Sequence, residues 1–569
     1  MARTHFALGA LFAGTLALAA CDSLPGMTSA SAALDVPDVP AGQISETTMK
    51  DAVRILSGDD FEGRAPGTAG EEKTIAFLTE RFKAAGLKPG NGDSWVQEVP
   101  LVEITGKNYA PLTVTGAKTG SPLSFDFAKD WVGVTYREEA KTAIKDSELV
   151  FVGYGINAPE RGWNDYAGLN VKGKTVVILV NDPDWQSAGL EGTFNGKAMT
   201  YYGRWTYKFE EAGRQGAAGA LIVHQTAPAA YGWNVVESSW TGAQAYAQRG
   251  KDAPPLTQMN GWVTEESARK LLKASGQDLD ALTKAAQTKG FKGVPLGLKV
   301  SASFESDVRS FMSHNVIGIL PGSEKPGEYV LHTAHWDHLG RCTPAPDGDD
   351  ICNGAIDNAT GTAALVALAE AHAKAGPTKR SLVFLAVTAE ESGLLGADYY
   401  AANPVFPLAQ TVGGVNMDAL QMGGPAKDVI VIGGGKSDLD RFLEAALKAD
   451  GRTITPDAKP EAGFYYRSDH FAFAKRGVPM IYLESGQDLV NGGRAAGEAI
   501  EKDYTDNRYH GPKDEFDPAW DWSGVMSSLQ IYYRLGRMMG TSTSWPNWIE
   551  GDEFRATRDA SCAADDDGC

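Results

Sequence analysis

The chain has 569 residues and the composition of an ordinary globular protein, with 43% hydrophobic and 22% charged residues. It is too long for one typical domain, so we expect two or more packed cores. The formal net charge of −19 argues against nucleic acid as a partner, because nucleic acids attract basic surfaces.

The N-terminus has the pattern of an export signal. Residues 1–20 contain Arg3, then a short apolar run and small residues before Cys21. The run is too short to span a bilayer and is typical of a secretory signal peptide. The segment LALAAC resembles a bacterial lipobox, which implies a lipid anchor at Cys21 and a periplasm-facing lipoprotein in the cell envelope of a Gram-negative-type bacterium. Simple signal cleavage beside an incidental cysteine is the alternative.

The segment after the signal and the other cysteines fit an exported protein. Residues 21–44 are small, contain Pro and lack periodicity, so we expect a flexible tether. The four remaining cysteines form two pairs that are each close in sequence. In an oxidising compartment we expect Cys342–Cys352 and Cys562–Cys569 disulfides.

Two helices are predicted where the ordered part begins. Ser45 is a good N-cap for a first helix that starts there. A second helix is predicted at 70–86, where Ile75, Leu78 and Phe82 lie on one face and Gly86 ends the helix.

The stretch from 129 to 300 has a different texture. Strands are predicted at 148–156, 174–182 and 218–225, with a helix at 207–217. It contains no cluster of His, Cys or paired acids with the character of metal ligands, so we predict a binding or lid module without chemistry of its own.

From residue 315 onward, predicted strands and helices alternate. We expect strands at 315–322, 328–335, 380–390, 410–419 and 479–485, and helices at 359–376, 394–403 and 437–451. Apolar strands separated by amphipathic helices predict an α/β fold, with a mostly parallel-stranded mixed sheet covered by helices on both faces. In such sheets the active site lies at the carboxyl ends of the strands.

Acidic and imidazole side chains gather at those predicted strand ends. The candidates are His335, Asp337, Asp357, Glu390, Glu391, Asp418 and His510. Each alone is weak, because a strand-end Asp is more often a helix cap and a lone His is usually packed. Together, imidazoles and carboxylates at successive strand ends suit zinc or a similar divalent ion. Five ligands with one shared carboxylate suit two ions roughly 3.5–4 Å apart.

The ordered motifs AHWDHLG, GAIDNATGTA, TAEESGLLG, NMDA and YHGPKDEFD resemble those of the M28 family of zinc peptidases. FEGRAPGTAGEEKT and YRSDHFAFAKRGVP are also similar to segments of that family. The resemblance implies a discontinuous, zinc aminopeptidase-like peptidase domain at 45–128 and 301–545, followed by a C-terminal tail at 546–569. VFVGYGINAPERGWNDYAGLNVKGKTVVILV with GAAGALIV resembles the protease-associated (PA) domain, which implies a β-rich PA insertion at 129–300.

The resemblance also implies two zinc ions per chain and a role for each site residue. His335 and Asp418 would bind one ion, Glu391 and His510 the other, and Asp357 both. Asp337 would orient His335, and Glu390 would be the general base for a water activated by the two ions. A cis peptide bond is expected at Asp357–Asn358. Tyr509 could donate a hydrogen bond to the developing oxyanion or only pack, and His470 could line the substrate pocket or be structural.

The function implied is that of a lipid-anchored aminopeptidase acting on peptides with a free N-terminus. A carboxypeptidase or dipeptidase of the same family is the first alternative, with Arg467 as a candidate to hold a free carboxylate. A metal-free, receptor-like binding protein is the second, but the presence of all five ligand positions and of Glu390 argues against it. The preferred side chain, the oligomeric state, the role of the PA insertion and the choice between inner and outer membrane stay open.

Overall fold

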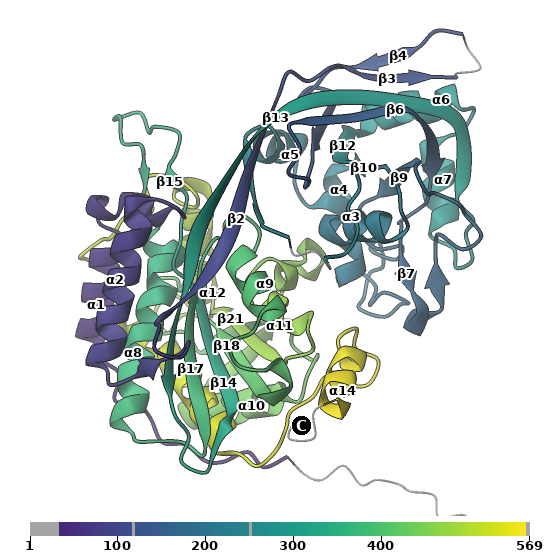
Figure 1. Cartoon of the computed structure of the whole chain (residues 1–569). Helices are drawn as coiled ribbons and strands as arrows, with labels where there is room; N and C mark the ends of the chain where they lie inside the picture. The colour runs from purple at the N-terminus through teal and green to yellow at the C-terminus, as the bar shows by residue number, and fades with distance from the viewer. Residues whose placement is uncertain (1–33, 117–119, 250–252, 565–569) are drawn as a thin grey trace, which may run out of the picture. The chain divides into compact units, whose positions relative to one another are not determined.

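The computed structural model describes residues 34–116, 120–249 and 253–564 (Figure 1). The predicted signal peptide at 1–20, the lipidation site Cys21 and the second predicted disulfide partner Cys569 lie outside the described residues. Val36 begins the unit that runs to the C-terminus. Within the described ranges, no helix has the length and apolar character needed to cross a membrane.

The first two helices form where the sequence predicts them. Helix α1 (Glu46–Leu56) begins after Ser45, whose side chain accepts a hydrogen bond from the Thr48 amide at 3.1 Å. Helix α2 (Ala69–Ala84) buries Leu78 and Phe82. Gly86 follows with a φ of +87°, a conformation that favours glycine and ends the helix.

The sheet that carries the site is mixed and mostly parallel, as predicted. Its neighbouring strands, in spatial order, are β13 (Val294–Leu320), β17 (Arg380–Val387), β14 (Lys325–His335), β18 (Thr411–Asn416), β21 (Met480–Ser485), β19 (Asp428–Ile432) and β20 (Thr453–Pro456). The run from β17 through β14 and β18 to β21 is parallel, and β13 and β19 join it in antiparallel pairs. This places the carboxyl ends of β14, β17, β18 and β21 at one edge.

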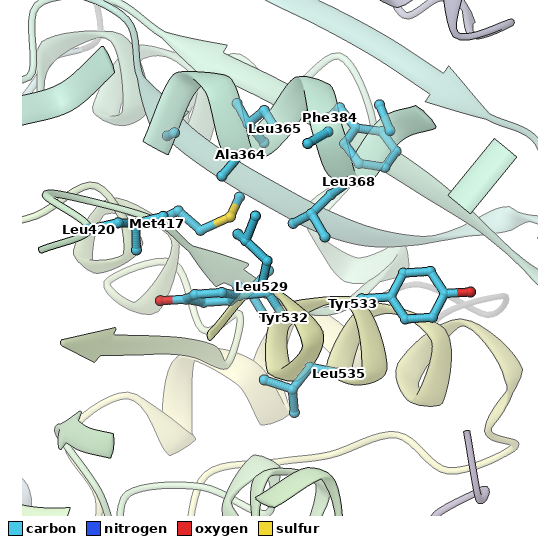
Figure 2. Close-up of a cluster of buried hydrophobic side chains, with 14 of the residues drawn as sticks. Ala364, Leu365, Leu368, Phe384, Met417, Leu420, Leu529, Tyr532, Tyr533 and Leu535 are labelled. Atoms are coloured by element: carbon cyan, nitrogen blue, oxygen red, sulfur yellow. The ribbon is translucent and has the colours of Figure 1, made fainter. Parts of the chain in front are cut away.

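Helices cover both faces of this sheet, because alternate residues of each strand point in opposite directions. Leu382 and Phe384 pack with α1, α2, α8 (Gly361–Lys374), α10 (Leu439–Asp450) and α13 (Ser523–Thr541). Val383 and Leu385 pack instead with α9 (Leu395–Ala402) and α11 (His470–Ala474). Figure 2 shows the first cluster, with side chains of α8 and α13 meeting those of β17.

The inserted stretch has its own packed interior. Two hydrophobic clusters draw their buried members from residues 112–304 alone. Parallel strands β6 (Lys141–Phe151), β9 (Thr175–Leu179), β10 (Gly219–His224) and β12 (Met259–Thr264) lie beside helices α3 (Trp205–Arg214), α6 (Glu265–Ala274) and α7 (Leu279–Ala286). The predicted strands and helix overlap β6, β9, β10 and α3. That this stretch is a PA domain stays a prediction.

Strand β13 belongs to both regions. Val294–Glu305 pairs with β6, Glu305–Val316 with β2 (Val96–Lys107), and Val316–Leu320 with β17. The boundary predicted between residues 300 and 301 therefore falls inside one continuous strand. Figure 1 shows β2 running beside one part of β13, while the rest of β13 continues alongside β6. The remaining elements are β1 (Lys88–Pro89), β3 (Leu112–Thr115), β4 (Leu123–Phe125), β5 (Trp131–Val134), β7 (Asn157–Ala158), β8 (Trp163–Asn164), β11 (Ala243–Ala247), β15 (Gly340–Arg341), β16 (Ile351–Cys352), α4 (Thr226–Ala229), α5 (Trp233–Trp240), α12 (Gly493–Asn507) and α14 (Arg555–Ala563).

A disulfide and the C-terminal segment complete the described chain. Cys342 and Cys352 are bonded, with Cα atoms 5.9 Å apart, which confirms the first predicted disulfide. The bond closes the loop around strands β15 and β16. In the predicted C-terminal tail, Trp548 is buried and donates to the Gly477 carbonyl at 2.8 Å, so this segment packs against the domain.

Candidate active site

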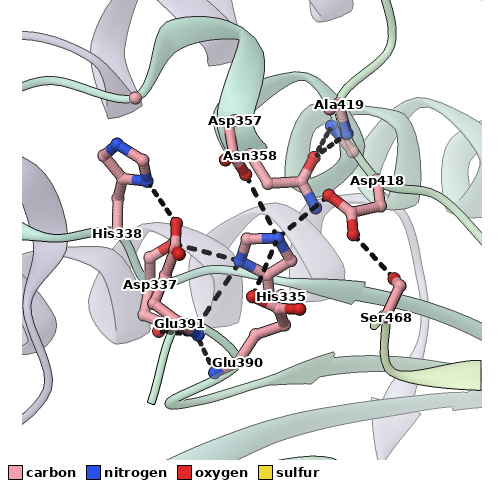
Figure 3. Close-up of polar contacts among 12 residues, drawn as sticks. His335, Asp337, His338, Asp357, Asn358, Glu390, Glu391, Asp418, Ala419 and Ser468 are labelled. Carbon is pink, nitrogen blue, oxygen red and sulfur yellow. Dashed lines mark hydrogen bonds and ion pairs between the residues drawn. The ribbon is translucent and has the colours of Figure 1, made fainter. Parts of the chain in front are cut away.

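The strand ends bring the predicted site residues together (Figure 3). His335 is the last residue of β14, Glu390 and Glu391 follow β17, and Asp418 follows β18. Asp357 lies in the turn just before α8, and His510 lies in the turn after α12. Parallel strands make this possible, because their carboxyl ends meet at the same edge of the sheet.

One group of ligand atoms surrounds His335. Its Nε2 lies 3.1 Å from Asp418 Oδ1 and 3.4 Å from Asp357 Oδ1. Glu390 Oε2 is further away, at 4.0 Å from the same nitrogen. The imidazole is completely buried, so its orientation is fixed by the surrounding protein.

A second group surrounds Glu391. His510 Nε2 lies 3.2 Å from Glu391 Oε2 and 3.3 Å from Asp357 Oδ2, so the two oxygens of Asp357 face two different imidazoles. His338 Nδ1 also contacts Glu391, at 2.6 Å from Oε1. The sequence assigned no role to His338, although it stands in the motif AHWDHLG. Unlike His335, His510 keeps 37% of its side chain exposed.

The spacing of these atoms fits zinc. Two ligand atoms that each lie about 2.0–2.1 Å from a tetrahedral zinc ion are about 3.3 Å apart. The separations of His335 Nε2 from Asp418 and Asp357, and of His510 Nε2 from Glu391 and Asp357, are 3.1–3.4 Å. His335, Glu390 and Asp418 form one compact set of possible ligand atoms, and His338, Asp357 and Glu391 form another. Imidazole nitrogen and carboxylate oxygen are the ligands that zinc accepts from this inventory of side chains.

The concentration of buried carboxylates in the site also favours binding of a cation. Burial raises the pKa of Glu390 well above its ordinary value, and the charges of Asp418 and Glu391 add to this effect. Burial also raises the pKa of Glu391, but hydrogen bonds from His338 and His510 more than offset it and bring the pKa to about 2. Burial lowers the pKa of His335, yet the facing carboxylates raise it well above normal overall. The pKa values of the two adjacent glutamates therefore move in opposite directions, upward for Glu390 because of burial and downward for Glu391 because of its two imidazole partners.

Asp337 holds the loop that carries both glutamates. Its carboxylate accepts hydrogen bonds from the backbone amides of Glu390 at 3.1 Å and Glu391 at 3.4 Å. The Nδ1 atom of His335 lies 3.2 Å from the Asp337 backbone carbonyl oxygen and 3.8 Å from its carboxylate. Asp337 thus contacts the His335 ring mainly through its backbone, while its side chain positions Glu390 and Glu391.

Three residues that the sequence reasoning did not single out hold the other ligands. Asp514 accepts hydrogen bonds from the amides of Ile356 and Asp357 at 2.9 and 3.0 Å. Ser468 donates to Asp418 Oδ2 at 2.6 Å. Asn358 accepts from the amides that follow both Asp357 and Asp418 in the chain, at Gly361 and Ala419. Each of the three lies inside a motif quoted in the sequence analysis. Their roles could not be assigned there because the sequence does not show which backbone amides and carboxylates they contact. The Asp357–Asn358 peptide bond is cis, as expected.

The remaining candidates are placed differently. Tyr509 is 49% exposed, lines the site cavity, and its ring stacks on His510 with centroids 3.8 Å apart. His470 is completely buried, stacks on Tyr482, and its ring nitrogens have no hydrogen-bond partner among the described residues. The structure therefore does not bring His470 to the cavity wall, and a structural role is the one that it supports.

The site opens into a cavity of about 370 Å³. Asp357, Glu390, Glu391 and Asp418 line it, and so do Lys459, Phe464 and Arg467. Cavities of about 300–1,000 Å³ are those that take small ligands, and this volume lies at the low end of that range. The cavity therefore has room for a small ligand.

Comparison with known proteins agrees with this geometry. Residues 315–533 match the model of Peptidase family M28. Leupeptin-inactivating enzyme 1 of Streptomyces exfoliatus is 28% identical over 276 residues, which are 46% of this chain and 57% of that protein. A glutamate carboxypeptidase 2 homolog of Caenorhabditis elegans is 32% identical over 131 residues, which are 22% of this chain and 16% of that protein. The chain thus spans less than two thirds of the length of either relative. The solved structure of an aminopeptidase from Aneurinibacillus sp. strain AM-1 aligns with a TM-score of 0.48 and 19% identity, over 88% of this chain and 95% of that one.

Proposed function

We propose that the chain is a zinc-dependent aminopeptidase that removes residues from the free N-terminus of peptides, a proposal supported by the match of residues 315–533 to the model of Peptidase family M28. One observation carries the proposal. The two oxygens of Asp357 face two imidazoles, at 3.4 Å from His335 and 3.3 Å from His510. This arrangement suits two ions that share one carboxylate, with His335 and Asp418 on one side and Glu391 and His510 on the other.

Zinc held there would supply a Lewis acid for the scissile carbonyl and lower the pKa of a nearby water. The protein would supply the proton transfer. Glu390 lines the cavity beside the candidate ligands, and at 4.0 Å it lies further from His335 Nε2 than Asp357 and Asp418 do. We assign Glu390 as the general base, which accepts a proton from the attacking water and returns it to the departing amine. Its loop is held in place by Asp337 through two backbone hydrogen bonds.

This division of labour accounts for the two adjacent glutamates. Their side chains point in different directions, so Glu391 meets His338 and His510 while Glu390 meets the His335 side of the site. Repulsion between the two carboxylates is offset by the imidazoles at present and by divalent cations when these are bound. One glutamate would thus act as a ligand and the other as a base.

The experiment that tests the function compares substrates and one variant. Purified protein is assayed with aminoacyl-amides and with the same peptides blocked at the N-terminus, and we expect cleavage of the unblocked ones only. Cleavage of blocked peptides from their C-terminus would instead support the carboxypeptidase alternative. In Glu390→Gln we expect bound zinc to stay near two per chain and the rate to fall about 10²–10⁴-fold, the usual contribution of a general base.

Failure of this proposal is equally measurable. A wild-type protein that binds no zinc and cleaves no peptide would support a receptor-like binding protein. A Glu390→Gln protein with normal zinc and normal rates would refute the base assignment alone.

We also propose that the chain is an envelope lipoprotein that is anchored through Cys21 and faces the periplasm. The segment LALAAC supports this, and no structural contact bears on it. Cell fractionation tests the proposal, with wild type expected in the membrane fraction and Cys21→Ser expected in the soluble fraction. Wild-type protein found in the soluble fraction would contradict it.

A further inference from the structure

Arg467 is a cation without a counter-charge in the wall of the site cavity. Its side chain is partly buried, packs over the Phe464 ring, and lines the same cavity as the four site carboxylates. Its Nε atom is buried without a partner, and within the described chain no carboxylate or carbonyl accepts a hydrogen bond from its guanidinium. The next residue, Ser468, donates to the candidate ligand Asp418.

Arg204, from the inserted region, is a second arginine without a counter-charge among the described residues. It is partly buried, its Nε is also without a partner, and its guanidinium forms no ion pair with any described residue. Burial and then the positive charge of Arg467 lower the pKa of Arg204 to about 10. The two cations are therefore close enough to repel each other.

Contacts between the two regions hold this arrangement in place. The Met199 amide donates to the Pro460 carbonyl at 3.1 Å, and Lys475 pairs with Glu210 at 2.9 Å. Tyr201 packs against the rings of Tyr466 and Phe471. The segment with Arg204 is thus fixed on both sides against the segment with Arg467.

The groups that face the two guanidiniums are phenols rather than acids. Tyr231 influences both arginines electrostatically, Tyr509 influences Arg467, and Tyr201 and Tyr466 influence Arg204. Phenols are neutral at pH 7, so they do not balance two positive charges.

Other buried arginines of the described chain have an acid or carbonyl partner for the guanidinium as a whole, although Nη2 of Arg380 and Nε of Arg534 are themselves unpaired. Arg64 donates to four backbone carbonyls, Arg380 pairs with Glu328, and Arg534 pairs with Asp450. A partly buried guanidinium without a counter-charge carries a desolvation cost, so Arg467 in the cavity wall marks a place where an anion would complete the structure.

We propose that Arg467, assisted by Arg204, binds a carboxylate of the peptide substrate and so directs the enzyme to short peptides whose carboxylate reaches this part of the cavity. The inference rests on the proposed peptidase function. Guanidinium groups match carboxylates in shape and can donate two parallel hydrogen bonds. The candidate site and Arg467 line the same cavity, and its volume of about 370 Å³ suits a peptide of two or three residues. The carboxylate can be the C-terminus or an acidic side chain, and substrate pairs separate the two sources.

The test measures kcat/KM of the full chain for matched substrates. Leu-Ala and Leu-Ala-amide differ only in the C-terminal carboxylate, and Leu-Glu-amide and Leu-Gln-amide differ only in a side-chain carboxylate. In wild type we expect one pair to show a preference of about tenfold or more for the carboxylate, because charge-assisted hydrogen bonds are the stronger ones. The pair that shows it identifies the source.

Variants locate the effect. In Arg467→Gln we expect the preference to fall to near one, in Arg467→Lys to fall partly because lysine cannot donate in the same fork, and in Arg204→Gln to fall less than in Arg467→Gln. Lys459→Gln is the matched control, since it removes one positive charge from the wall of the same cavity. It should keep the wild-type preference.

Three results would overturn the proposal. These are equal rates on both members of both pairs in wild type, an unchanged preference in Arg467→Gln, and an equal loss of preference in Lys459→Gln. If no peptide is hydrolysed, the proposed function fails, and calorimetry then tests the subsite separately. The probes are a Leu-Ala analogue with its scissile carbonyl reduced to methylene, and the amide of that analogue. Tighter binding of the free acid in wild type but not in Arg467→Gln supports the subsite, and equal or absent binding refutes it.

Discussion

The region that carries the candidate site (residues 301–545) and the inserted region (residues 129–300) both bury acidic residues after parallel strands. The two regions differ in the hydrogen-bond donors that they offer to these acids. In the inserted region, Asp182 follows β9 and is completely buried. Its carboxylate accepts hydrogen bonds from the amide and the hydroxyl of Thr200, at 2.6 and 3.0 Å. The buried ammonium of Lys208 lies nearby and lowers the Asp182 pKa against the larger raising effect of burial. This acid is satisfied by the protein itself.

Among the described residues, the acids of the candidate site do not have a comparable set of hydroxyl, amide and ammonium partners. Asp357, Glu390, Glu391 and Asp418 share one cavity and mostly face one another and the imidazoles. Burying charges without compensation is costly, so such a cluster persists where a bound cation completes it. The comparison shows that a buried acid at a strand end indicates a site only where the protein supplies it with few hydrogen-bond donors.

The largest effect is expected from removing Glu391, the candidate ligand that contacts both His338 and His510. In Glu391→Ala, His338 and His510 both lose their carboxylate partner. Loss of a residue that only supports a zinc ligand already costs about 10–100-fold, so we expect a drop in activity of at least about 1,000-fold, with less than one zinc bound per chain. Metal analysis and peptidase assays measure both. Wild-type zinc content in this variant would contradict the assignment of Glu391 as a ligand.

A smaller effect is expected from Asp337→Asn. The carboxylate accepts from the amides of both Glu390 and Glu391, whereas the asparagine amide has one accepting oxygen and presents N–H groups on the other side. We expect zinc affinity or activity to fall about 10–100-fold, as for other residues that support metal ligands. Competition with a chelator measures the affinity. An unchanged affinity together with an unchanged rate would show that the loop keeps its shape without Asp337.

The sequence was sufficient for the features that depend on local pattern. Strand-end motifs predicted which side chains meet around His335 and Asp357, and alternating apolar strands and amphipathic helices predicted the sheet. Features that depend on distant pairing were not predictable. The middle of β13, Glu305–Met312, is polar and largely exposed, so no apolar run indicated a continuous strand, and its pairing with β2 over about 200 residues of sequence supplies the hydrogen bonds. His338 could be assigned only after the fold placed Glu391 beside it, and Arg204 only after the inserted region placed it beside Arg467.

Asp182→Asn tests the role of the buried acid in the inserted region, which we expect to contribute to stability and not to zinc binding. Asparagine keeps the size of the side chain but removes the charge next to Lys208, so we expect the free energy of unfolding to fall by about 1–3 kcal/mol. Zinc content and kcat should stay at wild-type values, because no site ligand contacts Asp182. Urea denaturation followed by fluorescence measures the stability. A loss of zinc in this variant would mean that the two regions are not chemically independent.

The smallest effect is expected at Tyr509, on the exposed side of the metal site. His335 needs no help in orientation because it is completely buried, whereas His510 is 37% exposed and stacks on the Tyr509 ring at 3.8 Å. Stacked aromatic pairs contribute about 0.5–1.5 kcal/mol, so Tyr509→Ala should weaken zinc binding by only about 2–13-fold. Tyr509→Phe keeps the ring and should change zinc affinity and kcat by less than about threefold. If Tyr509→Phe instead lowered kcat about 100-fold with zinc affinity unchanged, the hydroxyl would be a donor to the oxyanion rather than a passive part of the stack, because losing one such donor costs about 10²–10³ in kcat.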